Sequence, residues 1–174
     1  MRNLAEVLAS SCGRVSGLIL ITVILSGCQG VAFGPIGRTV PENKWIFLSQ
    51  SGDQSGRWQN EDLILDYKYD RYQSQVSISG IIRFAGRIMN NYSVVQYFHL
   101  DAIAVDAQGK VLDMISLTTA GDLNSLYDGP VDFNKILTLP PNTAAIAFSY
   151  QGRAQGNGSG FGGGYMDFWE YPVY

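Results

Sequence analysis

Apolar and polar residues alternate with a period of two along much of the chain. The alternation is clearest over residues 63–84, where an apolar or aromatic side chain occupies nearly every second position. Because successive side chains of a strand point to opposite faces of a sheet, this pattern predicts half-buried β-strands. Further β-type runs occupy residues 45–48, 94–105, 110–117, 131–139, 143–150 and 165–171.

Turn-forming residues separate these runs. Asn90–Ser93 is typical of a turn, Gln108-Gly109 is typical of a hairpin, and Pro140-Pro141 would end the strand before them. No convincing stretch of 10 residues carries the period of an amphipathic helix. The sequence therefore predicts an all-β fold over residues 44–174, an antiparallel β-sandwich of about seven or eight short strands.

Composition narrows the classes of protein that fit this pattern. Hydrophobic residues make up 46% of the 174 residues and charged residues 16%, so a packed core is expected and disorder is not. The net charge of −3 provides no basic surface for phosphates, which argues against a nucleic-acid partner. The length allows one domain.

The N-terminus differs from the rest of the chain. After Arg14, the apolar run Val15–Leu25 has 11 residues, which is too short to cross about 30 Å of hydrocarbon but is typical of a signal-peptide core. An ordinary secretory signal or a very short uncleaved anchor helix would also fit this run. The residues at its end favour a third interpretation.

Leu25-Ser26-Gly27-Cys28 resembles the lipobox of bacterial lipoproteins, in which small residues precede an obligatory cysteine. The resemblance implies that residues 1–27 are a signal peptide, removed by a peptidase that recognises Leu25, Ser26 and Gly27. Cys28 would then carry diacylglycerol on its sulfur, and its amino group would usually be acylated, which gives a stable two- or three-chain anchor. Because Gln29 stands where an aspartate commonly retains such proteins in the inner membrane, the resemblance implies outer-membrane attachment. The domain would face the periplasm or, after export, the cell surface.

Cysteine usage agrees with this interpretation. Cys12 lies in the segment that would be removed, so the mature chain would contain Cys28 alone and no disulfide. Residues 28–43 are punctuated by Gly and Pro and are expected to form a flexible tether ahead of the domain.

One part of the expected domain has a family resemblance. Residues 86–112, with Asn90–Ser93 before a long apolar strand and Gln108-Gly109 after it, are similar to the strand–turn–strand of FxLYD-type Ig-like domains of envelope proteins. Where those domains carry their name-giving motif, this chain has Phe98–Asp101. The resemblance implies an Ig-like sandwich and gives no information on chemistry.

Candidate catalytic or metal-binding residues are few. His99 is the only histidine, so it cannot build a His-rich metal site, and it is expected to be a strand residue with a local hydrogen bond. Asp62, Asp66 and Asp70 are spaced four apart, which would align them on the polar face of a strand. That face is interpreted as solvated, with a weak cation site as the alternative.

Residues 152–164 are rich in glycine and are expected to form a flexible loop between the last two strands, with Phe161 exposed. Gly158–Gly163 matches the pattern Gly-x-Gly-x-x-Gly, but the dinucleotide fingerprint requires a strand before it and a helix after it. Because β-type runs lie on both sides, the match is interpreted as accidental.

The C-terminal segment is strongly aromatic. A period of two places Tyr165, Trp169 and Tyr171 on one face and Phe168 on the other. One aromatic face is expected to pack into the core. The sharper hypothesis is that Tyr165, Trp169 and Tyr171, together with Phe161, bind a partner, because tyrosine and tryptophan supply rigid contact area.

Two functions fit these expectations. The first is a lipid-anchored cell-envelope protein without enzymatic activity, cofactor or metal, whose sandwich binds or organises another envelope protein. The alternative is a carbohydrate- or cation-binding lipoprotein, or a hydrolase, that uses the face around Asp66, Asp70 and Tyr72. Convergence of these three side chains in a concave site would favour the alternative, and a flat face would favour the first function.

Overall fold

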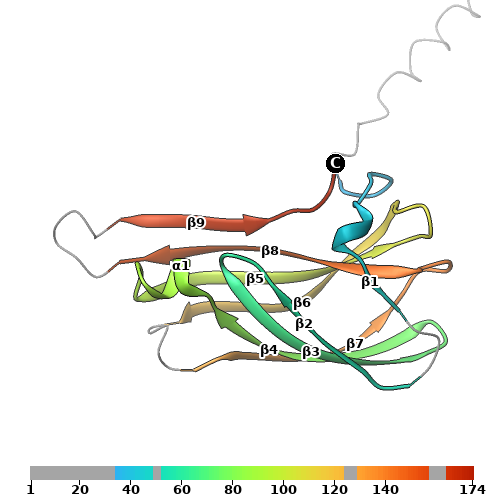
Figure 1. Ribbon diagram of the computed structural model, residues 1–174, viewed down its shortest axis with the longest axis horizontal. Coiled ribbons are helices and arrows are strands. Elements are labelled where there is room, and N and C mark those ends of the chain that lie inside the picture. Colours follow the sequence, from blue (N-terminus) through green and yellow to red (C-terminus); the bar gives the residue numbers. More distant parts are fainter. Residues whose placement is uncertain (1–33, 49–51, 124–128, 157–163) are drawn as a thin grey trace, which may run out of the picture. The chain divides into compact units, whose positions relative to one another are not determined.

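The computed structural model describes residues 34–48, 52–123, 129–156 and 164–174, and Pro35–Tyr174 form one compact unit (Figure 1). Nine β-strands account for most of the described residues. The two helical elements in these ranges are single turns, η2 at Glu42–Lys44 and α1 at Gly86–Met89. The all-β prediction is therefore confirmed.

Two antiparallel sheets face each other across a common core. One sheet has the strand order β2-β3-β4-β7, formed by Gln54–Gln59, Leu63–Tyr72, Gln75–Phe84 and Val131–Thr138. The other has the order β1-β8-β5-β6, formed by Ile46–Phe47, Ala145–Gln155, Val94–Val105 and Val111–Leu123. Strand β9 (Tyr165–Glu170) pairs with β8 on the edge that β1 also uses, because β5 occupies the opposite edge.

The chain crosses between the two sheets in the manner of an Ig-like sandwich. β4 and β5 follow one another but lie in different sheets, and so do β7 and β8. β7 returns to pair with β4, and β8 returns to pair with β5, as strands B, C, E and F of an Ig domain do. The Ig-like sandwich is confirmed with one additional strand. This is β2, whose sequence Gln-Ser-Gly-Arg-Trp-Gln has one large apolar residue and no hydrophobic alternation.

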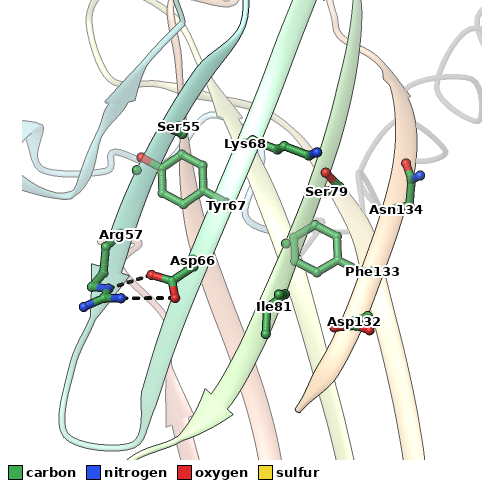
Figure 2. A pocket seen from close by; sticks show the side chains of 12 residues that line it. Ser55, Arg57, Asp66, Tyr67, Lys68, Ser79, Ile81, Asp132, Phe133 and Asn134 are labelled. Carbon is green, nitrogen blue, oxygen red and sulfur yellow. Dashed lines mark hydrogen bonds and ion pairs between the residues drawn. The ribbon is translucent and has the colours of Figure 1, made fainter.

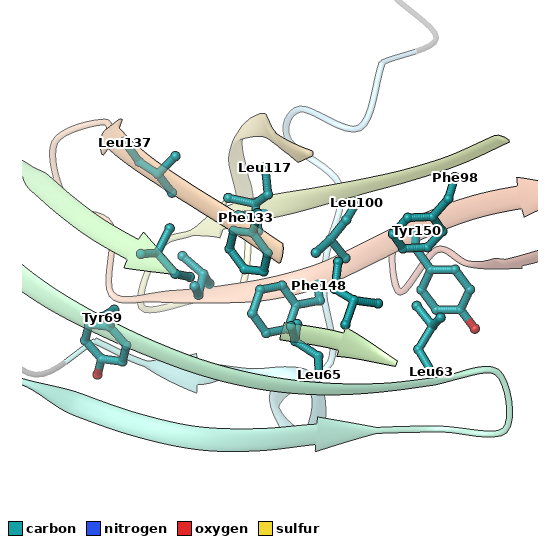
Figure 3. Close-up of a cluster of buried hydrophobic side chains, with 14 of the residues drawn as sticks. Leu63, Leu65, Tyr69, Phe98, Leu100, Leu117, Phe133, Leu137, Phe148 and Tyr150 are labelled. Carbon is teal, nitrogen blue, oxygen red and sulfur yellow. The ribbon is translucent and has the colours of Figure 1, made fainter. Parts of the chain in front are cut away.

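The core is built from the apolar positions of the alternating pattern. Leu63 and Leu65 of one sheet face the region of Phe98, Leu100 and Phe148 of the other (Figure 3). Each of these side chains is at most 1% exposed. Burying one such leucine or phenylalanine stabilises the fold by about 1.5–3 kcal/mol. The period-two prediction for residues 63–84 is thus confirmed.

Three strand glycines lie under an aromatic ring of the neighbouring strand. A Cβ added at any of them would overlap that ring, so the missing side chain is what lets the ring lie across the backbone. These pairs, directly opposite in register, are Gly56–Tyr67, Gly80–Phe133 and Gly152–Phe168. The loop prediction for residues 152–164 is wrong for its first four residues, because β8 continues to Gln155.

Part of the expected flexible tether is attached to the outer face of the sheet that contains β8, through the side chain of Val40 and the backbone of residues 37–40. Val40 is 1% exposed and joins a second, smaller apolar cluster with Ile103, Ala147 and Val173. Thr39 and Tyr174 exchange two backbone hydrogen bonds, which tie this segment to the C-terminal residues. The folded unit therefore begins at Pro35 rather than at residue 44. The apolar contacts of Val40 outweigh the local signal from glycine and proline.

Candidate functional site

Strand β9 divides its side chains between the core and the solvent. Phe168 is 1% exposed in the core, whereas Tyr165 and Trp169 are 61% and 66% exposed on the opposite face. Tyr171, directly after the strand, is also exposed. The predicted alternation is confirmed, and these three residues of the expected partner-binding set are accessible. Phe161, the fourth, lies outside the described residues.

β9 is an edge strand in the described part of the chain. Its residues pair with Tyr150–Gln155 of β8 on one side, and no described strand pairs with its other side. The backbone N–H and C=O groups on such an edge can accept a further strand. A free edge and exposed aromatic side chains therefore occur on the same strand.

A small hollow of about 200 Å³ opens beside these aromatic side chains. Its lining includes Trp169 and Tyr171 from the C-terminal segment and Met114 from β6. It also includes two polar residues that are almost fully buried, Asp101 of β5 and Ser149 of β8. Asp101 and Ser149 are opposite each other in the register, so both side chains point to the outer face of this sheet.

Asp101 is hydrogen-bonded to the only histidine of the chain. Nε2 of His99 lies 2.8 Å from Oδ1 of Asp101, and Nδ1 lies 2.7 Å from the hydroxyl oxygen of Thr119. His99 is therefore a strand residue with local hydrogen bonds, as predicted. Burial raises the pKa of Asp101, and the neighbouring His99 partly opposes this rise. Ser149 donates its hydroxyl hydrogen to the backbone carbonyl of Glu170 over 2.9 Å.

Of the three acidic residues expected on one solvated face, Asp66 and Asp70 take outward positions of β3, whereas Asp62 does not. Asp62 is 3% exposed and accepts hydrogen bonds from Arg87 over 2.6 and 2.9 Å and from Tyr150 over 2.8 Å. Asp62 immediately precedes β3, and Tyr150 belongs to the facing sheet. The prediction of a common face is therefore wrong for Asp62, whose carboxylate is bound inside the sandwich.

A broad hollow of about 990 Å³ lies on the outer face of the sheet that contains β3 (Figure 2). Its floor is backbone, because the side chains of Tyr67 and Phe133 belong to the core. Polar side chains along its borders are typical of the solvated face of an antiparallel sheet. Two cross-strand rows border it, namely Ser55, Lys68, Ser79 and Asn134, and Arg57, Asp66, Ile81 and Asp132.

Asp66, Asp70 and Tyr72 do not converge in this hollow. Hydrogen bonds from Arg57 and Arg83 lower the pKa of Asp66 to about 2, so this carboxylate is already paired. Asp70 lines an adjoining hollow of about 250 Å³, which shares Ser55, Lys68 and Ser79 with the first. Tyr72 is exposed and lines neither hollow. The arrangement is that of a solvated face rather than of one concave site.

Comparison with protein families, curated proteins and solved structures gave no match. Among the described residues, no three His, Cys, Asp or Glu side chains come together to hold a metal ion. No helix within those ranges is long and apolar enough to cross a membrane. Two sequence motifs lie outside the described ranges. They are the lipobox, formed by Leu25, Ser26, Gly27 and Cys28, and the glycine pattern of residues 158–163.

The sequence pattern alone does not single out Asp101 and Met114, which line the small hollow. A signal for Asp101 exists in β5, where Tyr97, His99 and Asp101 occupy the outward positions between apolar residues. Whether these outward residues line a hollow depends on which strands lie beside β5. The pairing of β5 with β6 and β8, and of β8 with β9, supplies that information.

Proposed function

We propose that this chain is a lipid-anchored protein of the bacterial cell envelope, without enzymatic activity, whose β-sandwich binds another envelope protein through the outer face of β9. The observation that carries the proposal is the exposure of Tyr165, Trp169 and Tyr171 on and beside a strand with no further strand partner among the described residues. Tyrosine and tryptophan are enriched at interfaces, since they bury a large area at a low cost in conformational entropy.

The exposed aromatic surface extends beyond β9. Tyr97 of β5 is exposed on the same face of the sheet, and Met114 of β6 is exposed at the small hollow. Several large exposed aromatic and apolar side chains on one face of a folded domain commonly mark an interaction site. A few large aromatic residues near the centre of an interface commonly supply most of the binding energy.

The lipid anchor is proposed from the resemblance of Leu25–Cys28 to a lipobox. Two or three acyl chains on Cys28 would hold the protein stably at the outer membrane, with the sandwich in the periplasm. Restriction to the membrane surface would raise the effective concentration of the β9 face for a partner in the same envelope. A modest affinity would then suffice for assembly.

The polar groups support binding rather than catalysis. Both ring nitrogens of His99 are hydrogen-bonded, and Asp66 is held between two arginines. A general base or nucleophile needs an available group beside a substrate pocket. The alternative carbohydrate or cation site would need Asp66, Asp70 and Tyr72 to converge, and they do not.

A photo-crosslinking amino acid at position 169 or 171 tests this function in intact cells. Tyr72, which is 72% exposed on the other sheet, supplies the matched control position. We expect both C-terminal positions to crosslink to the same envelope protein and position 72 to give no such product. Equal crosslinking from all three positions, or none from 169 and 171, would contradict the proposed function.

A further inference from the structure

The small hollow beside Trp169 indicates the chemistry of the partner. We propose that it receives a positively charged side chain of the bound protein, arginine in preference to lysine, which pairs with Asp101 beside Trp169 and Tyr171. This inference rests on the function proposed above and adds the residue type that the partner presents to the hollow.

Asp101 provides a negative charge with an incomplete set of partners. The residue is 6% exposed, and its Oδ1 is bonded to His99. Its Oδ2 has no hydrogen-bond partner among the described residues. A buried carboxylate with one unpaired oxygen destabilises the folded protein, in agreement with the raised pKa of Asp101. A cation bound at Oδ2 would supply the missing partner.

Neighbouring charged groups are already paired. Arg153 and Asp167 face each other on β8 and β9 and form two hydrogen bonds of 2.7 and 3.0 Å. Glu170 forms an ion pair with Lys44 at 2.5 Å. Asp101 is the only acidic residue among the described residues that line the hollow, so it is the carboxylate that a ligand would meet.

The aromatic residues of the hollow suit a planar cation. Trp169 and Tyr171 supply rings, and Met114 supplies a flexible apolar side chain. Aromatic rings attract cations through the negative potential of their faces. The guanidinium group of arginine is planar, weakly hydrated and able to stack on a ring, whereas the lysine ammonium is strongly hydrated. Arginine is therefore the better match.

The size and position of the hollow favour a side chain over a free ligand. Its volume of about 200 Å³ is below the roughly 300–1,000 Å³ typical of small-molecule sites. Asp101 lies on β5, two strands from β9, and adjacent strands are about 4.8 Å apart. A side chain on a strand added at the β9 edge would have to cross β9 and β8 to reach Asp101. The partner therefore covers the outer face of the sheet.

The test is a titration of the full chain, purified in detergent and labelled with ¹⁵N on its tryptophans, with N-acetyl-arginine amide. The chain has three tryptophans, and the indole signals of Trp45 and Trp58, both packed against apolar clusters, serve as internal references. We expect a saturable shift of the Trp169 signal. N-acetyl-lysine amide should bind more weakly, and the neutral N-acetyl-citrulline amide should produce no shift.

Asp101→Asn provides the decisive variant. Asparagine keeps the shape of the side chain and an acceptor for His99 but removes the charge, so we expect at least an about tenfold loss of affinity for arginine amide. Asp167→Asn, on the same face, is the matched control and should bind as the wild type does. Equal binding of citrulline amide, or no loss in Asp101→Asn, would overturn the proposal. An equal response to phosphoethanolamine would also overturn it and would assign the hollow to a lipid head group.

Crosslinking at position 169 separates this inference from the function on which it rests. If the crosslinked product forms at unchanged yield in Asp101→Asn, the β9 face binds its partner without a cation in the hollow, and this inference alone fails. If arginine amide binds but no product forms in the wild type, the proposed function fails.

Discussion

The hydroxyl of Tyr150 donates a hydrogen bond of 2.8 Å to Oδ2 of Asp62 and thereby joins the two sheets of the sandwich. Arg87 of α1 donates two further hydrogen bonds to the same carboxylate. The side-chain amide of Asn60 donates to the Tyr150 hydroxyl over 2.7 Å and to Glu170 of β9 over 2.5 Å. A network of polar groups that satisfy one another therefore crosses the space between the sheets.

Tyr150→Phe tests the contribution of this network to stability. Burial is the main cause that raises the pKa of Tyr150 well above its usual range, so the hydroxyl remains a donor across the working range of pH. Its removal leaves Asp62 and Asn60 each short of a partner, and we expect the free energy of unfolding to fall by about 1–3 kcal/mol. Urea unfolding measures this. Tyr97→Phe, on the exposed face, should change stability by less than about 0.5 kcal/mol. Unchanged stability in Tyr150→Phe would show that the network does not stabilise the sandwich.

Gly152→Ala tests the pairing of glycine with an aromatic ring. A Cβ at this position would overlap the ring of Phe168 and lie 2.9 Å from the carbonyl oxygen of Tyr97. We expect a loss of about 1–3 kcal/mol in the free energy of unfolding, because the core is overpacked. Gly121→Ala in β6 is the matched control, since the nearest atom to its Cβ, the carbonyl oxygen of Gln96, would be 4.0 Å away. Losses of equal size in the two variants would contradict this account.

Asp66 should contribute to the acid sensitivity of the fold. Arg57 and Arg83 lower the pKa of Asp66 from 3.8 to about 2, so the unfolded chain binds a proton at this residue before the folded protein does. The resulting stability is fully present above about pH 4 and is lost as the pH falls toward about 2.

The Arg57→Gln/Arg83→Gln double variant removes both partners of Asp66. We expect its melting temperature to fall less between about pH 4 and 2 than that of the wild type, measured by thermal unfolding. Lys68→Gln removes a positive charge of the same face that is not bonded to Asp66, and it should retain the wild-type dependence. Superimposable profiles for the double variant and the wild type would rule out this contribution.

The sequence predicts those parts of the fold that depend on the burial pattern within a single strand. The alternation over residues 63–84 gives the buried face of β3 and β4, because burial of every second side chain is the main force on these strands. β2 has no such pattern, and its place depends on pairing with β3. The four-residue spacing of Asp62 and Asp66 suggests one face, but Asp62 lies just outside the strand, where Arg87 binds it.

The same distinction applies to the candidate site. The exposed side chains of Tyr165 and Trp169 follow from the period of two within one strand. The hollow does not, because Asp101, Met114 and Trp169 come from three strands that long-range pairing brings together. Its two buried polar residues, Asp101 and Ser149, can be placed opposite each other only once the register of β5 with β8 is known.

Cys28→Ala tests the proposed lipid anchor. In a bacterial host, we expect this variant to lose metabolic labelling by palmitate and to retain residues 1–27, because the lipid-carrying sulfur is absent. Cys12→Ala is the matched control and should be labelled and processed as the wild type is, since Cys12 lies within the proposed signal peptide. Labelling of Cys28→Ala at the wild-type level would refute the lipobox interpretation.

Binding through the outer face of β9 is tested most directly by the affinity of Trp169→Ala for the protein captured by crosslinking at position 169. Loss of a central aromatic residue commonly costs about 2 kcal/mol, so we expect binding to weaken about 30-fold. Tyr72→Ala, which removes an exposed aromatic side chain from the other sheet, should bind as tightly as the wild type. Equal affinity of Trp169→Ala and Tyr72→Ala for that protein would contradict the proposed interface.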